Sequence, residues 1–396
     1  MQKTFRVILI VILSLMSVIS VVQGIRNAAV FSQDFQWDAA EAFSMKIDPY
    51  DESLSPSGAL DNEPLSDFYD YYEGIDAPQK MEANQFPSLL MLLLPYVCMS
   101  PNAARYAWLI TNLIYTAGII VLLRVTFLKK MPKYEYAVLI LLMLSGTPYR
   151  NQLGVGQHTI FSLFFFLLAV WLVDKKWGSI PEVAALVISY FKYTLTAPLA
   201  LYFVYKRKWK ELIASIMVHV VLTEVAALWL NESFMDMLIK PLKVSGALAS
   251  EGGLDLGALL NGSPVAFILA GIIMIILLIL SLKLPDESDG TIIAVLVLWS
   301  LILTYHRTYD FFAMVLASSM LEILPWDKQS YTGKIKLAGF VLITLMVFYV
   351  LRVFNEALPA RIIIGIMYYA YTIFITITAA MPIINKRLES KKCLQK

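Results

Sequence analysis

The chain has 396 residues, of which 59% are hydrophobic and only 16% are charged, and its mean hydropathy is +0.67. A soluble domain is nearer half apolar and a quarter charged, so this composition excludes an ordinary soluble domain. The formal net charge of +2 says little about partners, because the charged residues are segregated along the chain.

The hydrophobic residues form long runs, such as 263–283 and 362–384. Each run is long enough to cross the roughly 30 Å hydrocarbon core of a bilayer as a helix. A backbone in lipid must satisfy its own hydrogen bonds, so such runs must be helical. A membrane β-barrel would instead show short alternating segments, which this sequence lacks. The sequence therefore predicts an all-α, polytopic membrane protein.

The first predicted membrane helix lies within residues 1–23. Lys3 and Arg6 precede the apolar stretch 7–22, and no small-residue cleavage site follows it. We therefore expect a retained helix rather than a signal peptide. Segment 24–86 then carries thirteen acids and only three bases. Because cytoplasmic loops are rich in bases, 24–86 is predicted to be an extracytoplasmic acidic loop.

Part of this loop has a helical pattern. Apolar residues recur at helical spacing at Trp37, Ala40, Phe43 and Ile47. The opposite face is polar, which is typical of a helix that lies along a membrane interface. We expect an interfacial helix over 34–47. The segment 52–83 holds Ser, Gly, Pro and acids and is predicted to be mostly irregular.

The positions of the other basic residues set the rest of the predicted topology. Clusters of Lys and Arg fall within 124–133, 175–176, 206–210, 328–336 and 386–392. All should be cytoplasmic, which places both termini in the cytoplasm of a multi-pass cell-membrane protein. Residues 87–385 then form a polytopic domain, and 386–396 form a basic tail. Apolar runs of membrane length give about ten full crossings.

Two apolar segments do not fit single crossings. Segment 181–205 has basic clusters at both ends and is interrupted by Lys192 and Pro198. Broken helices are tolerated in membranes only where they are buried in protein or line a cavity. We therefore expect two half-helices that enter and leave on the same side. Segment 86–99 is short and bounded by prolines, so it is predicted to re-enter from the outer side.

Ionisable residues near membrane depth are costly and are functional hypotheses by default. The candidates are Asp34, Asp38, Arg150, His158, Lys192, His219, Glu224, His306, Arg307 and Asp310. On the predicted topology several of them lie on the outer side, with Lys192 at the apex of the two half-helices. An acid, a histidine and several cations are thus expected to meet in one outer cavity.

Five segments then carry a family pattern in order along the chain. They are DFQWDAAEAFSMKIDPYD (34–51), NQFPSLLMLLLPY (84–96), GVGQHTIFSLFFFLLAVWL (154–172), YFKYTLTAPLALYFVYKRKW (190–209) and HRTYDF (306–311). Together they resemble glycosyltransferase family 87, polyprenyl-phosphate-sugar-dependent enzymes of the GT-C membrane superfamily. Three features depart from the family pattern: Thr159 replaces the usual Asn, Phe86-Pro87 replaces Pro-Pro, and 52–83 is a long insertion.

This resemblance implies a GT-C-like fold and transfer of a sugar, most simply a mannose-like hexose, from a polyprenyl-phosphate donor. The acceptor would be a hydroxyl of a glycan or glycolipid on the extracytoplasmic side. Such a transfer needs a carboxylate that can take the hydroxyl proton. Asp34 aligns with the family's acidic residue and is the expected base, with Asp38 as competitor. The alternative for Asp34 is an N-cap of the helix at 37–47.

The departing lipid phosphate needs cations and hydrogen-bond donors. The expected substrate-binding residues are Lys192, His306, Arg307, Arg150, Gln157 and His158. The two arginines could instead extend toward the membrane surface without binding substrate. His306 could be a structural hydrogen bonder, and Gln157 and His158 could cap the helix that follows them.

No cofactor is required by this interpretation, although the acidic loop could bind a divalent ion because hard cations take carboxylate oxygens. The expected partners are the lipid-linked donor, the acceptor and the bilayer, and no nucleic acid. One alternative is an O-antigen polymerase or ligase, which would carry its long outer loop late in the chain. The other is a transporter, which would show internal repeats and polar residues at the membrane midplane.

Overall fold

The computed structural model describes residues 2–55, 81–247, 253–285, 288–322, 324 and 326–394. Within these residues every regular element is helical, as the sequence predicts. Most of the predicted insertion, 52–83, lies outside the described residues.

The first half of the chain pairs long helices with short ones. The N-terminal elements are α1 (Gln2–Val30), η1 (Gln33–Phe35), α2 (Trp37–Ser44) and α3 (Pro49–Leu54). From residue 87 the order is α5 (Pro87–Leu90), η3 (Met91–Leu93), α6 (Leu94–Val97), α7 (Pro101–Thr126), α8 (Lys133–Ser145), α9 (Thr147–Gly154) and α10 (Thr159–Lys175).

The middle of the chain contains α11 (Ser179–Ser189), η4 (Tyr190–Lys192), α12 (Tyr193–Leu199), α13 (Leu201–Tyr205), α14 (Trp209–Leu230) and α15 (Phe234–Ala247). The last part contains α16 (Leu256–Leu259), α17 (Pro264–Lys283), α18 (Asp289–Leu303), η6 (Thr308–Met320), η7 (Trp326–Lys328), α19 (Tyr331–Leu345), the π-helical turn η8 (Met346–Val350), α20 (Leu351–Val353) and α21 (Leu358–Leu394).

Among the described residues, six helical runs are long and apolar enough to cross a membrane: α1, α7, α14, α17, α19 continued through α20, and α21. The pair α9 and α10 meets the same criterion together, but it is bent by 106°. The predicted count of about ten crossings is therefore not confirmed. One reason is that some predicted spans are short helices, such as α18 with 15 residues.

The two segments predicted to be irregular in the membrane are both interrupted. The 3-10 turn η4 separates α11 from α12 and ends at Lys192, so the predicted break is present. Residues 87–97 form three short apolar turns rather than one helix. Whether either segment enters and leaves on one side of a membrane stays a prediction.

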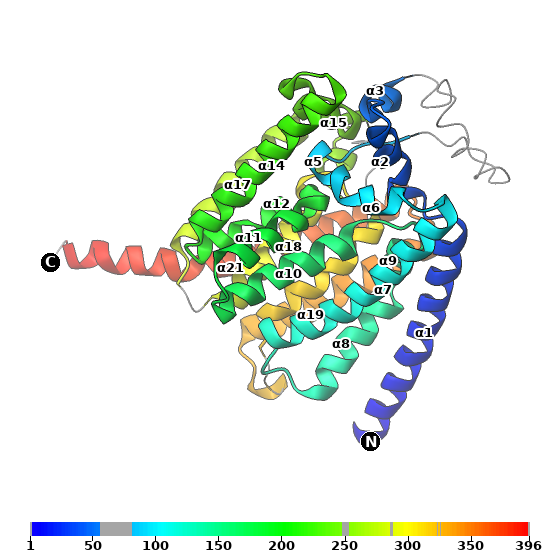
Figure 1. Ribbon diagram of the computed structural model, residues 1–396. Coiled ribbons are helices and arrows are strands. Elements are labelled where there is room, and N and C mark those ends of the chain that lie inside the picture. The colour runs from blue at the N-terminus through cyan, green and yellow to red at the C-terminus, as the bar shows by residue number, and fades with distance from the viewer. Residues whose placement is uncertain are drawn as a thin grey trace.

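The predicted helix of the acidic loop is present as α2. Its apolar side, with Trp37, Ala40 and Phe43, is buried against the short helices α5 and α6 rather than left free. The helix begins and ends inside the predicted range, because the chain turns after Ser44 and restarts as α3. Figure 1 shows α2, α3, α5 and α15 gathered at one end of the molecule, opposite the N-terminus.

The core is built around α18, whose side chains from Ile292 to Leu303 are all buried. A helix that is apolar on every side is covered by protein or by lipid, and α18 is covered by protein. The 3-10 helix η6 packs along α18 and is also almost wholly buried. The connection between them, residues 304–307, therefore holds its side chains at one end of the most protected pair of helices.

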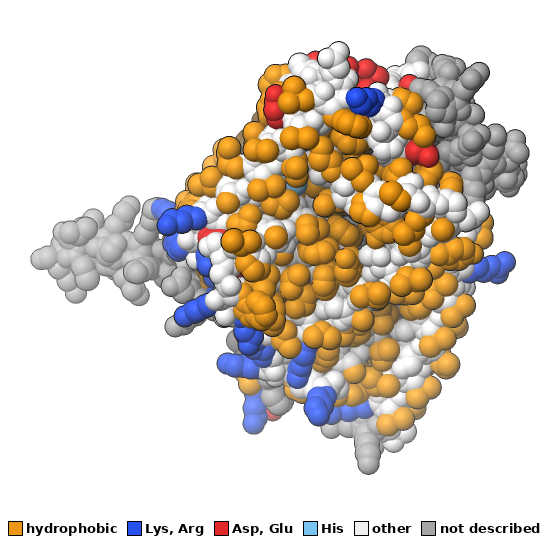
Figure 2. Space-filling view, in the orientation of Figure 1, with side chains coloured by type: hydrophobic (Ala, Val, Ile, Leu, Met, Phe, Trp, Pro, Cys, Tyr) orange, Lys and Arg blue, Asp and Glu red, His pale blue; other side chains and the backbone are white. Residues whose placement is uncertain are grey.

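Charge divides the surface between the two ends of the molecule. Figure 2 shows hydrophobic atoms across the middle of one face, acidic atoms at the upper end and most of the Lys and Arg atoms at the lower and lower-left edges. An apolar belt between charged ends is the surface expected of a protein embedded in lipid.

Candidate active site

Asp34 lies in a strained turn between α1 and α2. The residues on either side of η1, Ser32 and Gln36, have left-handed φ values of 39° and 58°. Such conformations cost about 1–3 kcal/mol each for non-glycine residues and persist only where other contacts fix them. Here the Gln36 amide donates to the carbonyl of Glu82 at 2.8 Å. Asp34 does not cap α2, because the N-cap position is occupied by Gln36, whose side chain makes no capping hydrogen bond to the helix.

The turn at Asp34 is fastened to the break between α9 and α10. The N–H of Asp34 donates to the carbonyl of Val155 at 2.9 Å. The next residue, Gly156, has a φ of 70°, and a Cβ there would lie 3.2 Å from that of Ser32. Glycine allows both the backbone conformation and the close approach. The bend therefore brings Gln157 beside Asp34.

One oxygen of the Asp34 carboxylate is held by two donors. Oδ2 accepts a hydrogen bond from the Tyr309 hydroxyl at 2.9 Å and one from the Gln157 amide at 3.2 Å. The same amide donates to the Tyr309 oxygen at 3.0 Å. Within the described part of the chain, no hydrogen bond reaches Oδ1. The two hydrogen bonds that described residues make to the Asp34 side chain therefore both go to Oδ2.

The surroundings of Asp34 make it a stronger base than an ordinary carboxylate. Burial raises the pKa of Asp34, while the hydrogen bond from Tyr309 and the charges of Arg307 and Lys192 lower it. Burial dominates, so the pKa lies above its ordinary value. A carboxylate with a raised pKa is better matched to accept a proton near neutral pH.

Lys192 is buried beside Asp34 and forms an ion pair. Its ammonium lies 2.9 Å from Oδ1 of Asp310, and the two side chains are 8% and 1% exposed. Asp310 also accepts a bond from the Thr159 hydroxyl, and its Oδ2 lies 2.9 Å from Nδ1 of His306. Asp310 thus joins side chains from η4, α10 and the 304–307 connection into one polar cluster.

Arg307 directly follows His306 and is less buried than Lys192 and Asp310. Its Nε donates to the Tyr305 hydroxyl at 2.7 Å, and the side chain is half-buried. Its charge interacts with Asp34. Lys192, by comparison, is more deeply buried and is paired with Asp310.

Two predicted site residues, Asp38 and Arg150, share no hydrogen bond with Asp34 or its donors. The Asp38 carboxylate accepts a bond from the N–H of Ala39 at 2.8 Å, and burial raises its pKa to about 6. Arg150 bonds to Gln23 at 3.2 Å and to Asn151, along α1 and α9. Neither bonds to Asp34 or to its partners.

His158 is fully buried and is held among aromatic rings. Its Nε2 lies 3.1 Å from the carbonyl of Phe35, while Trp108 and Phe191 pack edge-on against the imidazole. The ring therefore anchors the backbone next to Asp34. A direct contact of His158 with sugar or phosphate stays a prediction.

The structure adds two residues that the sequence did not single out, Tyr309 and Thr159. Tyr309 follows His306 and Arg307 in the HRTYDF segment, but a tyrosine in an apolar chain gives no signal of its own. Thr159 stood out only as a departure from the family pattern. Asp310 was a candidate without a role, and the structure makes it the partner of Lys192.

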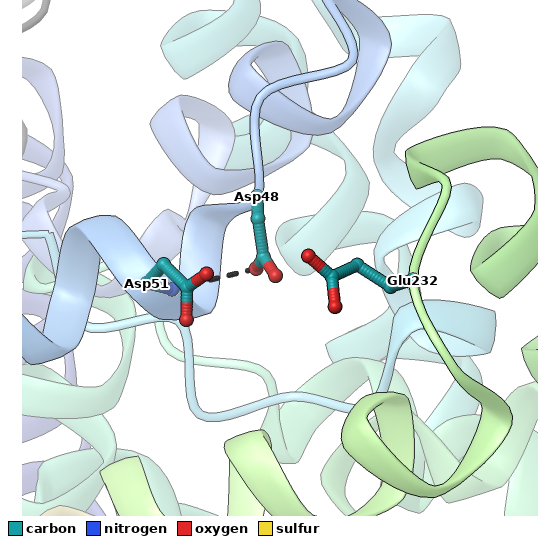
Figure 3. A group of neighbouring side chains, drawn as sticks. All are labelled: Asp48, Asp51 and Glu232. Carbon is teal, nitrogen blue, oxygen red and sulfur yellow. Dashed lines mark hydrogen bonds between the residues drawn. The ribbon is translucent and has the colours of Figure 1, made fainter.

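A second acidic group lies nearby in the same part of the chain. Asp48 and Asp51 at the start of α3 face Glu232, which follows α14, and their carboxylate oxygens lie within 4.8 Å of one another (Figure 3). The Lys240 ammonium contacts all three, at 2.6, 2.9 and 3.4 Å respectively. These acids, the described ones best grouped for a divalent ion, therefore already share a cation.

An apolar cavity of about 240 Å³ opens between α14, α5 and η4. It is lined by Phe86, Ser88, Leu89, Tyr190, Tyr193, Ile216, His219, Val220, Thr223, Phe234 and Leu238. His219 is fixed at its edge by Ser88 and the carbonyl of Val187, each at 3.0 Å. Tyr190 and Tyr193 bracket Lys192 in the chain, so one turn lines the cavity and also supplies the buried ammonium.

The fold and the site together describe a helical membrane protein with a carboxylate and cations grouped at one end. The model of glycosyltransferase family 87 matches residues 87–325, more than half of the chain, and the protein belongs to that family. It is a membrane glycosyltransferase. The match includes Gln157, Lys192 and Arg307 but begins after Asp34. No curated protein and no solved structure matches the chain.

Proposed function

We propose that this protein transfers a mannose-like hexose from a polyprenyl-phosphate donor to a hydroxyl of a glycan or glycolipid, with Asp34 as general base. The observation that carries the proposal is the Asp34 carboxylate, which keeps Oδ1 unbonded to any described residue and lies within the fields of Arg307 and Lys192. Family membership favours this function over the polymerase, ligase and transporter alternatives.

The bond changes follow from the positions of these groups. The acceptor oxygen attacks the anomeric carbon while its proton passes to Oδ1 of Asp34. The bond between that carbon and the phosphate oxygen breaks, and polyprenyl phosphate leaves with the electron pair. Arg307 stabilises the charge that develops on the phosphate, because a guanidinium matches phosphate oxygens with paired donors. The positive charge of Lys192, which Asp310 neutralises in part, also stabilises the charge on the phosphate.

A lipid-linked donor is supported by the apolar cavity between α14 and η4. Its lining is almost entirely hydrocarbon and aromatic ring, which suits an isoprenoid chain. Tyr190 and Tyr193 of this lining flank Lys192 in the chain, so an isoprenoid in this cavity would pass close to the turn that carries the ammonium. The described residues contain no β-strand, so they supply no strand-to-helix loop of the kind that binds nucleotide phosphates.

The charged ends of the molecule support an extracytoplasmic site. Most of the Lys and Arg atoms gather at the end opposite to α2 and α3 (Figure 2). Because positive residues favour the cytoplasmic side, that end would face the cytoplasm and Asp34 would face outward. Both termini would then be cytoplasmic, in a cell membrane crossed up to about ten times, as the predicted topology requires.

The test is the Asp34→Asn variant, with Asp38→Asn as the matched control. Transfer of radiolabelled mannose from polyprenyl-phosphate mannose to envelope glycolipid extract should fall by about 100-fold or more, since a general base contributes at least that much. Binding of polyprenyl phosphate should be unchanged, because the cavity and Arg307 remain. Asp38→Asn should transfer at nearly the wild-type rate. If Asp34→Asn is active and Asp38→Asn is inactive, the general base is Asp38 and not Asp34.

A further inference from the structure

Tyr309 is the side chain through which the parts of the site are connected. Its hydroxyl bonds to Oδ2 of Asp34 at 2.9 Å and to the Gln157 amide at 3.0 Å. Its ring lies over the Lys192 ammonium, 5.5 Å from the ring centre. Tyr309 itself is only 7% exposed. It therefore contacts the base, a donor of the base and the buried cation at once.

The direction of the proton between Tyr309 and Asp34 is fixed by Gln157. The amide oxygen of Gln157 accepts the N–H of His158 at 2.7 Å, so its amino group must face Asp34 and Tyr309. An amino group only donates, so it occupies a lone pair of the Tyr309 oxygen. The Tyr309 O–H is then directed at Oδ2 of Asp34.

The position of the Tyr309 ring is restrained by its contact with Lys192. Lys192 is fixed by Asp310 at 2.9 Å, and Asp310 follows Tyr309 directly in η6. A cation under an aromatic face is attracted by the ring. Tyr309 therefore has little freedom to swing its hydroxyl away from Asp34.

We propose that Tyr309 is a positioning residue of the transfer reaction: with Gln157 it holds Oδ2 of Asp34 so that Oδ1 alone receives the acceptor proton. This inference rests on the proposed function, because it assigns Tyr309 a role through the base. Tyr309 does not touch the reacting atoms. Its donated hydrogen bond also lowers the basicity of Asp34 and so sets the pH at which the base becomes active.

The experiment is the pH profile of kcat/KM for Tyr309→Phe, which removes the hydroxyl and keeps the ring over Lys192. Loss of a donor to a carboxylate raises its pKa, so the acidic limb should move to higher pH by about one unit. Asp34 accepts a proton only when it is ionised, so the pH must lie above its raised pKa for activity. A further rise of this pKa therefore reduces transfer at low pH more than transfer at high pH. On the plateau, kcat should fall by up to about 100-fold, which is the loss that a misplacement of about 1 Å can cause.

Tyr149→Phe is the matched control, because Tyr149 is also buried and its hydroxyl donates to the Thr116 hydroxyl at 3.1 Å, away from Asp34. The acidic limb of the pH profile of Tyr149→Phe should lie at the same pH as that of the wild-type protein. Gln157→Leu, which removes the second donor, should move the limb in the same direction as Tyr309→Phe, and it serves if Tyr309→Phe does not fold. An unshifted limb in both variants overturns the role of Tyr309. If Asp34→Asn is inactive in the same assay, only this inference fails; if it is active, the proposed function fails.

Discussion

Two acid–lysine clusters include acids from the segment 31–55, and the ammonium group has a different place in each. Around Asp34 the carboxylate is held by neutral donors, and the nearest ammonium, on Lys192, is paired to a second acid. Around Asp48 a single ammonium, on Lys240, contacts three acids directly. Burial lowers the pKa of Lys240, but hydrogen bonds to Asp48 and Asp51 outweigh it and raise the pKa.

This difference distinguishes a cluster that could act as a base from a cluster that links two helices. A base must keep a lone pair free, so its oxygen cannot be occupied by a protein cation. Lys240 satisfies its acids and ties α3 to α15, next to the segment that leads into the insertion. Asp34 instead has one oxygen held and one unbonded by any described residue. For this reason the proposed base is placed in the first cluster and not in the second.

The largest effect on stability is expected where the Lys192–Asp310 pair is broken. Lys192→Met or Asp310→Asn leaves one buried charge without its partner, which typically costs about 3–5 kcal/mol. The thermal midpoint of the detergent-solubilised protein should therefore fall sharply in either variant. The double variant should lose less than the sum of the two.

The control for this prediction is Lys206→Met, which removes an ion pair at 2.6 Å with Asp289 that is much more exposed. A pair of this kind contributes at most about 1 kcal/mol. Equal destabilisation by Lys192→Met and Lys206→Met would mean that burial of the site pair has no energetic consequence.

An intermediate effect is expected at the second cluster. Lys240→Met leaves three carboxylates close together, and because the group is partly exposed the loss should be about 1–3 kcal/mol. Transfer activity should stay within about twofold, since the base keeps both of its donors. Carboxylates without their ammonium would accept Ca²⁺.

Millimolar Ca²⁺ should therefore raise the thermal midpoint of Lys240→Met and leave that of the wild-type protein unchanged. Stabilisation of the wild-type protein by Ca²⁺ at this cluster would contradict the view that Lys240 already occupies the place of a cation.

The smallest effect is expected for Asp51→Asn. The Asp51 side chain is 58% exposed, so its bond to Lys240 competes with water. The free energy of unfolding should change by less than about 1 kcal/mol. Asp48→Asn, at 11% exposure, should cost more, and chemical denaturation of the two variants side by side would rank them. The reverse order would show that Asp51 carries the contact.

The membrane-embedded fold could be predicted well from local patterns. Long apolar runs gave the spanning helices, and the spacing of Trp37, Ala40 and Phe43 gave α2 and its buried side. Lys192 within an apolar segment signalled the break at η4. The number of crossings was less predictable. The helix α18 is apolar because it lies in the core of the protein, and a helix exposed to lipid would have the same hydropathy.

The candidate site could be predicted only in part. Asp34, Gln157, Lys192, His306 and Arg307 were named from charge, position and family pattern, and the structure brings them into one region. Tyr309 was not named, because its importance lies in contacts with residues 152 and 275 positions away in sequence. Arg150 and Asp38 fit the same charge pattern but lie apart from the cluster.

The sequence by itself determined that the chain is helical, lies in a membrane and is similar to glycosyltransferase family 87. These properties follow from the length of apolar runs and from short motifs, both of which are local. Only the tertiary structure decided which oxygen of Asp34 is held, that Lys192 is neutralised by Asp310, and that Lys240 saturates the second acidic group. Hydrogen bonds and ion pairs act over a few ångströms, so they depend on which distant segments the packing brings together.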